Sequence, residues 1–229
     1  MIMNTLYSIF HGMSGMLIHP RQTSKELVSD ASLRPVLILV FTFGILYSLI
    51  FLISYLAHDY PPPPDVLAVW VEHWGEGVML PFFNTPAESY RGFQAAIMLP
   101  FVLAIWMLMG GTARLLALLL GGRQSYETYL RVTGFTFFTI WLISAFLDYL
   151  YSSAFKEIVL RGLKGEYGSF VDALLQGFMP VEYILLYGLV AVNIAIAART
   201  IEQFAWWKAA IVGIAAFAWP MVLVSSIVR

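Results

Sequence analysis

Five long apolar stretches constrain this chain more than any other feature of its sequence. They occupy residues 35–57, 94–116, 132–151, 180–198 and 205–228. A helix needs about 20 mostly apolar residues to cross the hydrocarbon core of a bilayer. The composition agrees, because 60% of the 229 residues are hydrophobic and only 12% are charged, about half the charged share of a soluble domain. We therefore predict an all-α polytopic membrane protein with five transmembrane helices, of which the second and third can shift by several residues.

The distribution of lysine and arginine predicts the orientation of these spans. With five spans, one face carries eight basic residues, namely Arg21, Lys25, Arg34, Arg114, Arg123, Arg131, Arg199 and Lys208. The opposite face carries five, namely Arg91, Lys156, Arg161, Lys164 and Arg229. Because basic residues accumulate on the cytoplasmic side, we expect a multi-pass protein whose N-terminus is cytoplasmic and whose C-terminus is outside.

Residues 1–34 precede the first span, and we expect them to form cytoplasmic interfacial helices beside a transmembrane domain of residues 35–229. Apolar residues recur at helical spacing in the first of these, at Met3, Leu6, Ile9, Phe10, Met13, Met16 and Leu17. The other side of this segment is too polar to span, so the helix should lie flat on the membrane. A second short helix is expected to begin at Pro20.

The long outer loop, residues 58–92, begins "HDYPPPPD", and its four consecutive prolines favour a stiff polyproline spacer. The following segment has an acidic stripe opposite an apolar, tryptophan-bearing side when placed on a helix. We predict an interfacial helix there and consider it a candidate interaction helix on the outer face. Its candidate residues are Trp70, Glu72, His73, Trp74 and Glu76.

The segment "LALLLGGRQSYETYLRVTGF" between the second and third spans resembles a glycine-rich phosphate loop at first sight. A phosphate loop needs a preceding strand, a following helix and usually a lysine in a fixed glycine pattern. Here Gly121 and Gly122 follow an apolar helix instead, where glycine favours a helix C-terminus. Ser125 suits the N-cap of the next helix, and Glu127 suits its first turn. We predict a tight hairpin between two spans.

No pattern in the chain predicts catalysis, a metal or another cofactor. The absence of cysteine excludes disulfides and thiolate chemistry. His73 and Glu76 share one turn, and His58 and Asp59 flank the prolines, but a catalytic metal needs at least three ligands in defined geometry. There is no G-x-S-x-G or H-E-x-x-H motif. The net charge of −1 gives no basic surface for nucleic acid, and we expect no removable signal peptide.

Polar residues inside or near the spans are the better functional lead, because burying them in lipid is costly unless they are paired. The candidates are Arg114, Asp148, Glu182 and Asn193. The first three lie where they can reach an interface, whereas Asn193 lies near the middle of a span. It favours a hydrogen bond between helices over contact with a substrate. Small residues at Ala191, Ala195, Ala209 and Gly213 are spaced for close helix packing.

The chain as a whole resembles the Yip1-domain membrane proteins, and its short form is similar to the prokaryotic members. The resemblance rests on "LIHPRQTSKELVSDASLRPVLIL", on the five spans and on "LLALLLGGRQSYETYLRVTGF", and it covers roughly residues 12–228. It implies an integral membrane protein, and we expect it in the cell inner (cytoplasmic) membrane. Eukaryotic members are linked to Rab GTPases and vesicle traffic, but this chain has only a short N-terminal region and no "DLYGP"-like motif. The family implies no catalytic residues.

Two functions remain open from the sequence. The favoured one is a non-enzymatic scaffold or accessory subunit that associates with another membrane protein or with itself, or that organises membrane lipids. The alternative is a small transporter, channel or lipid-handling protein with a polar path near Arg114, Asp148 and Asn193. Five spans give no obvious inverted repeat, which disfavours the alternative.

Overall fold

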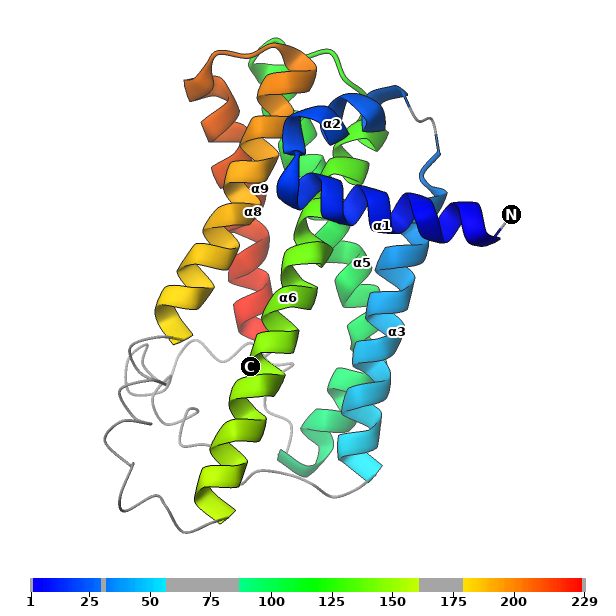
Figure 1. Cartoon of the computed structure of the whole chain (residues 1–229), viewed down its shortest axis with the longest axis vertical. Helices are drawn as coiled ribbons and strands as arrows, with labels where there is room; N and C mark the ends of the chain where they lie inside the picture. The colour runs from blue at the N-terminus through cyan, green and yellow to red at the C-terminus, as the bar shows by residue number, and fades with distance from the viewer. Residues whose placement is uncertain (1, 30–31, 57–86, 161–178, 228–229) are drawn as a thin grey trace.

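The computed structural model describes residues 2–29, 32–56, 87–160 and 179–227. Within these ranges the chain forms seven helices and no strand, which confirms the all-α prediction (Figure 1). The helices are α1 Ile2–Ile18, α2 Pro20–Ser29, α3 Arg34–Leu56, α5 Ala87–Leu119, α6 Tyr126–Leu160, α8 Met179–Glu202 and α9 Trp206–Ile227.

Four helices of the described part are long and apolar enough to cross a membrane. The qualifying stretches are Arg34–Ile53, Gly92–Leu119, Tyr126–Leu147 and Ile184–Glu202, in α3, α5, α6 and α8. The chain is therefore a polytopic membrane protein, as predicted. The fifth predicted span, 205–228, coincides with the 22-residue helix α9, which is not among the four. The side chains of α9 beyond Pro220 lie outside the described residues.

The five long helices run side by side, and α6 lies at their centre (Figure 1). It packs against α3 and α5 on one side and against α8 on the other, while α9 packs against both α5 and α8. Burial follows this arrangement. Inside the protein, 72% of the membrane-crossing stretch of α6 is buried, against 33% for each of the other three. The neighbours of α6 therefore present most of their surface outward, toward lipid.

An aromatic cluster joins α3 to α6 in the middle of the bundle. Its members are Phe43 and Tyr47 from α3 and Phe137, Phe138 and Trp141 from α6. The ring centroid of Trp141 lies 5.2 Å from that of Phe43 and 5.1 Å from that of Tyr47, both in tilted geometry. Such offset pairs contribute beyond the area they bury. We call these five residues the aromatic cluster.

The small residues predicted for close packing lie where α8 crosses α9. A Cβ atom added to Gly213 would lie 2.8 Å from the Cβ of Ala195 and would also clash with the carbonyl oxygen of Ala191. Both Ala195 and Ala209 are buried. Close backbone approach is a main source of helix association in lipid, and here it depends on the glycine.

The two N-terminal helices lie outside the parallel arrangement. Helix α1 crosses the bundle nearly at right angles to the long helices, and α2 lies nearer the end of the bundle (Figure 1). Helix α1 packs against α6 and α3, whereas α2 packs mainly against α8. Two helices are thus present in the segment where the sequence predicts interfacial helices.

Candidate functional site at the polar end of the bundle

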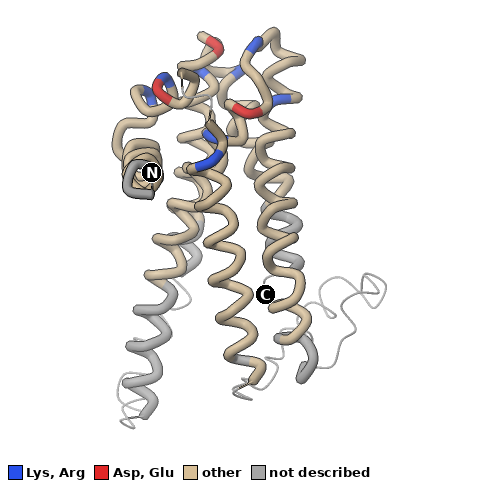
Figure 2. Tube along the Cα trace, turned by 90° about the vertical axis from the view of Figure 1, so that its right-hand side faces the viewer, with Lys and Arg blue, Asp and Glu red and all other residues tan. Residues whose placement is uncertain are grey.

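Charged residues gather at one end of the bundle (Figure 2). The basic residues with described side chains are the same eight that the sequence assigns to one membrane face. Only three acidic side chains are described, and these are Glu26, Glu127 and Glu202. We call this region, which contains α2 and the turns α5–α6 and α8–α9, the polar end. The structure brings the eight basic residues together, and whether that end is cytoplasmic stays a prediction.

The α5–α6 turn has the geometry that its two glycines favour. Gly121 has a φ of 94°, a left-handed conformation that glycine adopts at little cost. Its N–H donates to the carbonyl of Leu118 (3.0 Å), and the N–H of Gly122 donates to the carbonyl of Ala117 (2.7 Å). These two bonds form a Schellman motif, which satisfies carbonyls at the end of α5. The predicted hairpin is confirmed, and the segment carries no phosphate-loop geometry.

Helix α6 begins with the N-cap that the sequence predicts. The hydroxyl oxygen of Ser125 accepts a hydrogen bond from the N–H of Thr128 (3.2 Å), and Glu127 lies in the first turn. A hydroxyl at this position satisfies one of the four N–H groups that a helix N-terminus leaves without an internal partner.

Glu202, at the C-terminus of α8, binds the α5–α6 turn. The N–H of Arg123 donates to its Oε2 (2.6 Å), and the N–H of Gln124 donates to its Oε1 (3.0 Å). The hydroxyl of Tyr129 also donates to Oε1 (3.1 Å). A carboxylate that accepts several N–H and O–H bonds near a helix N-terminus is favoured by charge and by the helix dipole. We call this arrangement the Glu202 clasp.

The second glycine of the turn makes the clasp possible. A Cβ atom on Gly122 would lie 2.7 Å from Oε1 of Glu202 and 2.8 Å from the carbonyl oxygen of Ala117. Any larger residue would therefore displace the carboxylate. On the other side, Gln203 follows Glu202 with a φ of 56°, an uncommon conformation for a residue other than glycine. It ends α8 just after the carboxylate.

Basic side chains complete the polar end. The ammonium group of Lys208 donates to the carbonyl oxygen of Leu120 (2.8 Å), which ties α9 to the C-terminus of α5. The guanidinium of Arg199 lies 4.1 Å from the ring centroid of Trp206, and Trp206 and Trp207 are both exposed. Exposed tryptophans beside basic residues are typical of the interface between hydrocarbon and headgroups.

A buried asparagine attaches α1 to the spanning bundle. Asn193 in α8 is 3% exposed, and its Nδ2 donates to the carbonyl oxygen of Met16 (3.0 Å). Met16 lies in the last turn of α1, where carbonyl groups lack intrahelical partners. Asn193 therefore joins helices by a hydrogen bond, and its partner is the crossing helix α1.

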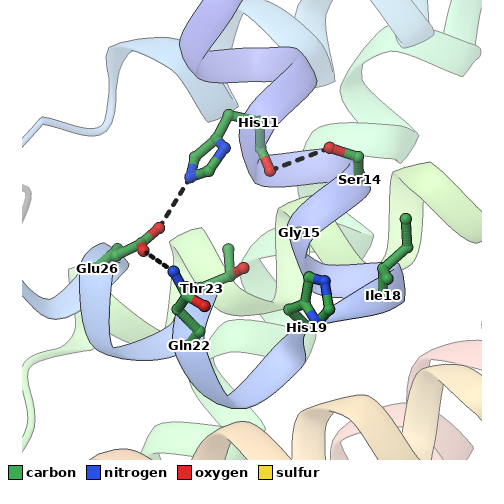
Figure 3. Close-up of a pocket in the computed structure, with 8 residues that line it drawn as sticks. All are labelled: His11, Ser14, Gly15, Ile18, His19, Gln22, Thr23 and Glu26. Carbon is green, nitrogen blue, oxygen red and sulfur yellow. Dashed lines mark hydrogen bonds and ion pairs between the residues drawn. The ribbon is translucent and has the colours of Figure 1, made fainter.

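A shallow hollow lies at the elbow between α1 and α2 (Figure 3). On one side of it, Nε2 of His11 shares a hydrogen bond with Oε2 of Glu26 (2.8 Å), and Nε2 of Gln22 donates to Oε1 of Glu26 (2.9 Å). The bond with His11, followed by that with Gln22, lowers the pKa of Glu26 from its usual range. His19 lines the opposite side (Figure 3). The pair His11–Glu26 links the two helices across their turn.

The predicted site residues do not form one constellation. Arg114 lies at the polar end, half-buried, with its Nη1 3.5 Å from the carbonyl oxygen of Gly122, whereas Asn193 lies in α8 and donates to a carbonyl of α1. Asp148 and Glu182 belong to α6 and α8, but their side chains are outside the described residues, as is the whole predicted outer-face helix with Trp70, Glu72, His73, Trp74 and Glu76. Among the described residues, no three His, Cys, Asp or Glu side chains are placed to hold a metal ion.

Sequence reasoning missed the residue that organises the polar end. Glu202 lies outside the predicted fourth span and looks like an ordinary exposed acid in a turn. One signal was available, since it is the sole acidic residue in the basic segment 199–208. Its partners lie about 78 positions earlier in the chain, so that no local pattern reveals them.

These features define the class of protein, an all-helical polytopic membrane protein with an N-terminal helix pair docked beside its spanning bundle. Residues 14–228 match the model of the Yip1 domain. The chain therefore belongs to the Yip1 domain family, which confirms the resemblance drawn from the sequence. Comparisons with curated proteins and with solved structures gave no match.

Proposed function

We propose that this protein is a non-enzymatic scaffold or accessory subunit of the bacterial inner membrane. It would associate with another membrane protein or with a second copy of itself, or organise membrane lipids, without a cofactor and without nucleic acid. The observation that carries this proposal is the Glu202 clasp. Its carboxylate is the most promising candidate for a chemical role among the acids at the polar end. It accepts hydrogen bonds from two backbone N–H groups and from one phenol hydroxyl. That role is structural.

A buried polar residue of α8 supports the same proposal. The amide of Asn193 donates to a main-chain carbonyl of α1 and so holds a surface helix in place. A transport path would instead need polar groups that face a continuous cavity. The alternative is a small transporter, channel or lipid-handling protein, and neither Glu202 nor Asn193 supports it over the scaffold.

Purification in native lipid tests the proposal. We expect a membrane protein, or a second copy of the chain, to co-purify at a fixed ratio through two orthogonal tags and to be identified by mass spectrometry. Glu202→Leu should weaken this association through the loosened polar end, whereas the exposed Glu127→Leu should leave it unchanged. A single monodisperse copy without any fixed-ratio partner, in each of several native lipid extracts, would contradict the scaffold.

Proteoliposomes test the alternative directly. Ion flux or lipid scrambling that disappears in Asn193→Leu, while the neighbouring exposed Val192→Leu retains it, would replace the scaffold by a transporter or lipid-handling protein. Orientation needs a separate measurement, because the proposed cytoplasmic N-terminus rests on charge distribution. Reporter fusions at the two ends should be active on opposite sides of the membrane.

A further inference from the structure

Helix α1 has three distinct flanks, and the first is held by the bundle. Ile9 and Met16 are 8% and 0% exposed. Between them lies Gly12, where an added Cβ atom would be 2.7 Å from Cε1 of Phe135 in α6. These residues lie on one side of the helix at 100° per residue. Together with the bond from Asn193 to Met16, they fix how α1 is rotated about its own axis.

The second flank carries polar groups and faces α2. His11 reaches Glu26, and a Cβ atom on Gly15 would clash with the side chain of Thr23. Both contacts point from α1 toward α2, which lies nearer the end of the bundle where the charges gather (Figures 1 and 2). This flank therefore faces the polar end.

The third flank is apolar and exposed. Leu6 and Phe10 are 46% and 69% exposed, and Met13 and Leu17 lie beside them, partly buried. On a helix of 3.6 residues per turn, this flank lies about 100° from the bundle flank and about 150° from the flank that faces α2. Leu6 and Phe10 therefore point away from the charged end, toward the level of the membrane interior.

Lipid is the partner that this third flank fits. Helix α1 packs against α3, whose exposed residues Ile38, Phe41 and Ile45 belong to a membrane-crossing stretch. The apolar flank of α1 thus continues a surface that faces acyl chains. The basic residues of the polar end lie on the other side of α1, where anionic headgroups would meet them.

We propose that α1 is inserted into a single leaflet, with Leu6 and Phe10 among the acyl chains and His11 at headgroup level, so that the protein acts as a one-sided wedge. A bundle that carries an extra helix in one leaflet takes more area there than in the other, and it should concentrate on curved or loosely packed membranes. This inference develops the lipid-organising part of the proposed function and needs no protein partner.

Depth measurements test the insertion. Because the chain has no cysteine, Phe10→Cys and Lys25→Cys each give one labelling site, on the apolar flank of α1 and on the exposed side of α2 at the polar end respectively. We expect an environment-sensitive fluorophore at position 10 to be quenched by lipids brominated on their acyl chains, and the fluorophore at position 25 by an aqueous quencher. Equal quenching at both positions would overturn the insertion. Protection of position 10 from both quenchers would also overturn it, because a protein would then cover the flank.

Vesicle size tests the wedge. The density of wild-type protein in small vesicles should exceed that in large vesicles by about twofold or more. Phe10→Ser should remove the preference. Phe146→Ser, the same exchange at an exposed position of α6 that is 61% exposed, should retain it. An equal loss in both variants, or no preference in the wild type, would overturn the wedge. The scaffold proposal fails separately, by the absence of a co-purifying partner.

Discussion

The polar end and the aromatic cluster hold the helices of one bundle together by different means. At the polar end, hydrogen bonds join turns that are far apart in the sequence, as from Glu202 to Arg123 and Gln124. In the aromatic cluster, rings of α3 and α6 interlock without a charged group. Apolar contact between helices gains little over contact with lipid tails. The cluster therefore depends on close fit, whereas the clasp depends on several directed hydrogen bonds to one carboxylate.

This difference separates two properties of the bundle. Ring packing is the sum of many weak contacts, and no single one of them selects one position of a helix along its neighbour. A carboxylate that accepts three hydrogen bonds permits one register of α8 against the α5–α6 turn. We infer that the aromatic cluster supplies much of the packing energy and that the clasp determines the relative positions of the helix ends.

The largest expected effect is in the aromatic cluster. Phe138→Ala removes a ring that is fully buried and that contacts Phe43 at 5.3 Å between centroids. The cavity should lower the free energy of unfolding by about 3 kcal/mol. This change in the free energy of unfolding can be measured in mixed micelles from the fluorescence of the seven tryptophans. Phe146→Ala, at an exposed position, is the control. An equal loss of stability there would show that packing in the aromatic cluster contributes no additional free energy of unfolding.

Loss of the clasp should follow. Glu202→Leu leaves two backbone N–H groups and the Tyr129 hydroxyl without their acceptor, and we expect a loss of about 2 kcal/mol in the free energy of unfolding. Hydrogen exchange at Arg123 and Gln124 should rise, whereas exchange in α3 should not. The exposed Glu127→Leu is the matched control. Unchanged protection of the turn in Glu202→Leu would mean that the Schellman motif alone holds it.

A smaller effect is expected where the crossing helix is attached. Asn193→Leu removes the donor to Met16 and should reduce stability by about 1 kcal/mol, as for other hydrogen bonds between membrane helices. Exchange should increase in the last turn of α1 and not in α9. Val192→Leu in the same helix serves as control. If α1 kept its protection, its packing on α6 through Ile9 and Gly12 would be sufficient to hold it.

The smallest effect concerns pH at the elbow. Since hydrogen bonds to His11 and Gln22 lower the pKa of Glu26 from its ordinary value of 4.5, its contribution to α1–α2 contact is complete above that pH. The contribution is lost as pH falls through the lowered pKa, because protonation removes the carboxylate. The distribution of electron-spin distances between labels at Phe10 and Lys25 should broaden as the pH falls below 4.5 and through the lowered pKa of Glu26. Glu26→Gln should show the broad distribution at every pH, and a pH response that persists in this variant would contradict the assignment.

The sequence determined those features that depend on composition and on neighbours along the chain. Apolar runs of about 20 residues predict spans because lipid offers no hydrogen bonds to an unpaired backbone. The glycine pair and Ser125 predict a helix end and a helix start, since each acts on its own backbone. The close helix packing at Gly213 and Ala195 could also be predicted, because small residues at helical spacing indicate close approach of two helices.

Only the tertiary structure decided which distant groups meet. It gave Glu202 its partners on the α5–α6 turn, paired Asn193 with a carbonyl of α1, and turned Leu6 and Phe10 away from the charged end. Each result depends on the relative rotation and height of helices that are far apart in the chain. Those quantities follow from the fit of all packed side chains together, and the periodicity of any one segment does not contain them.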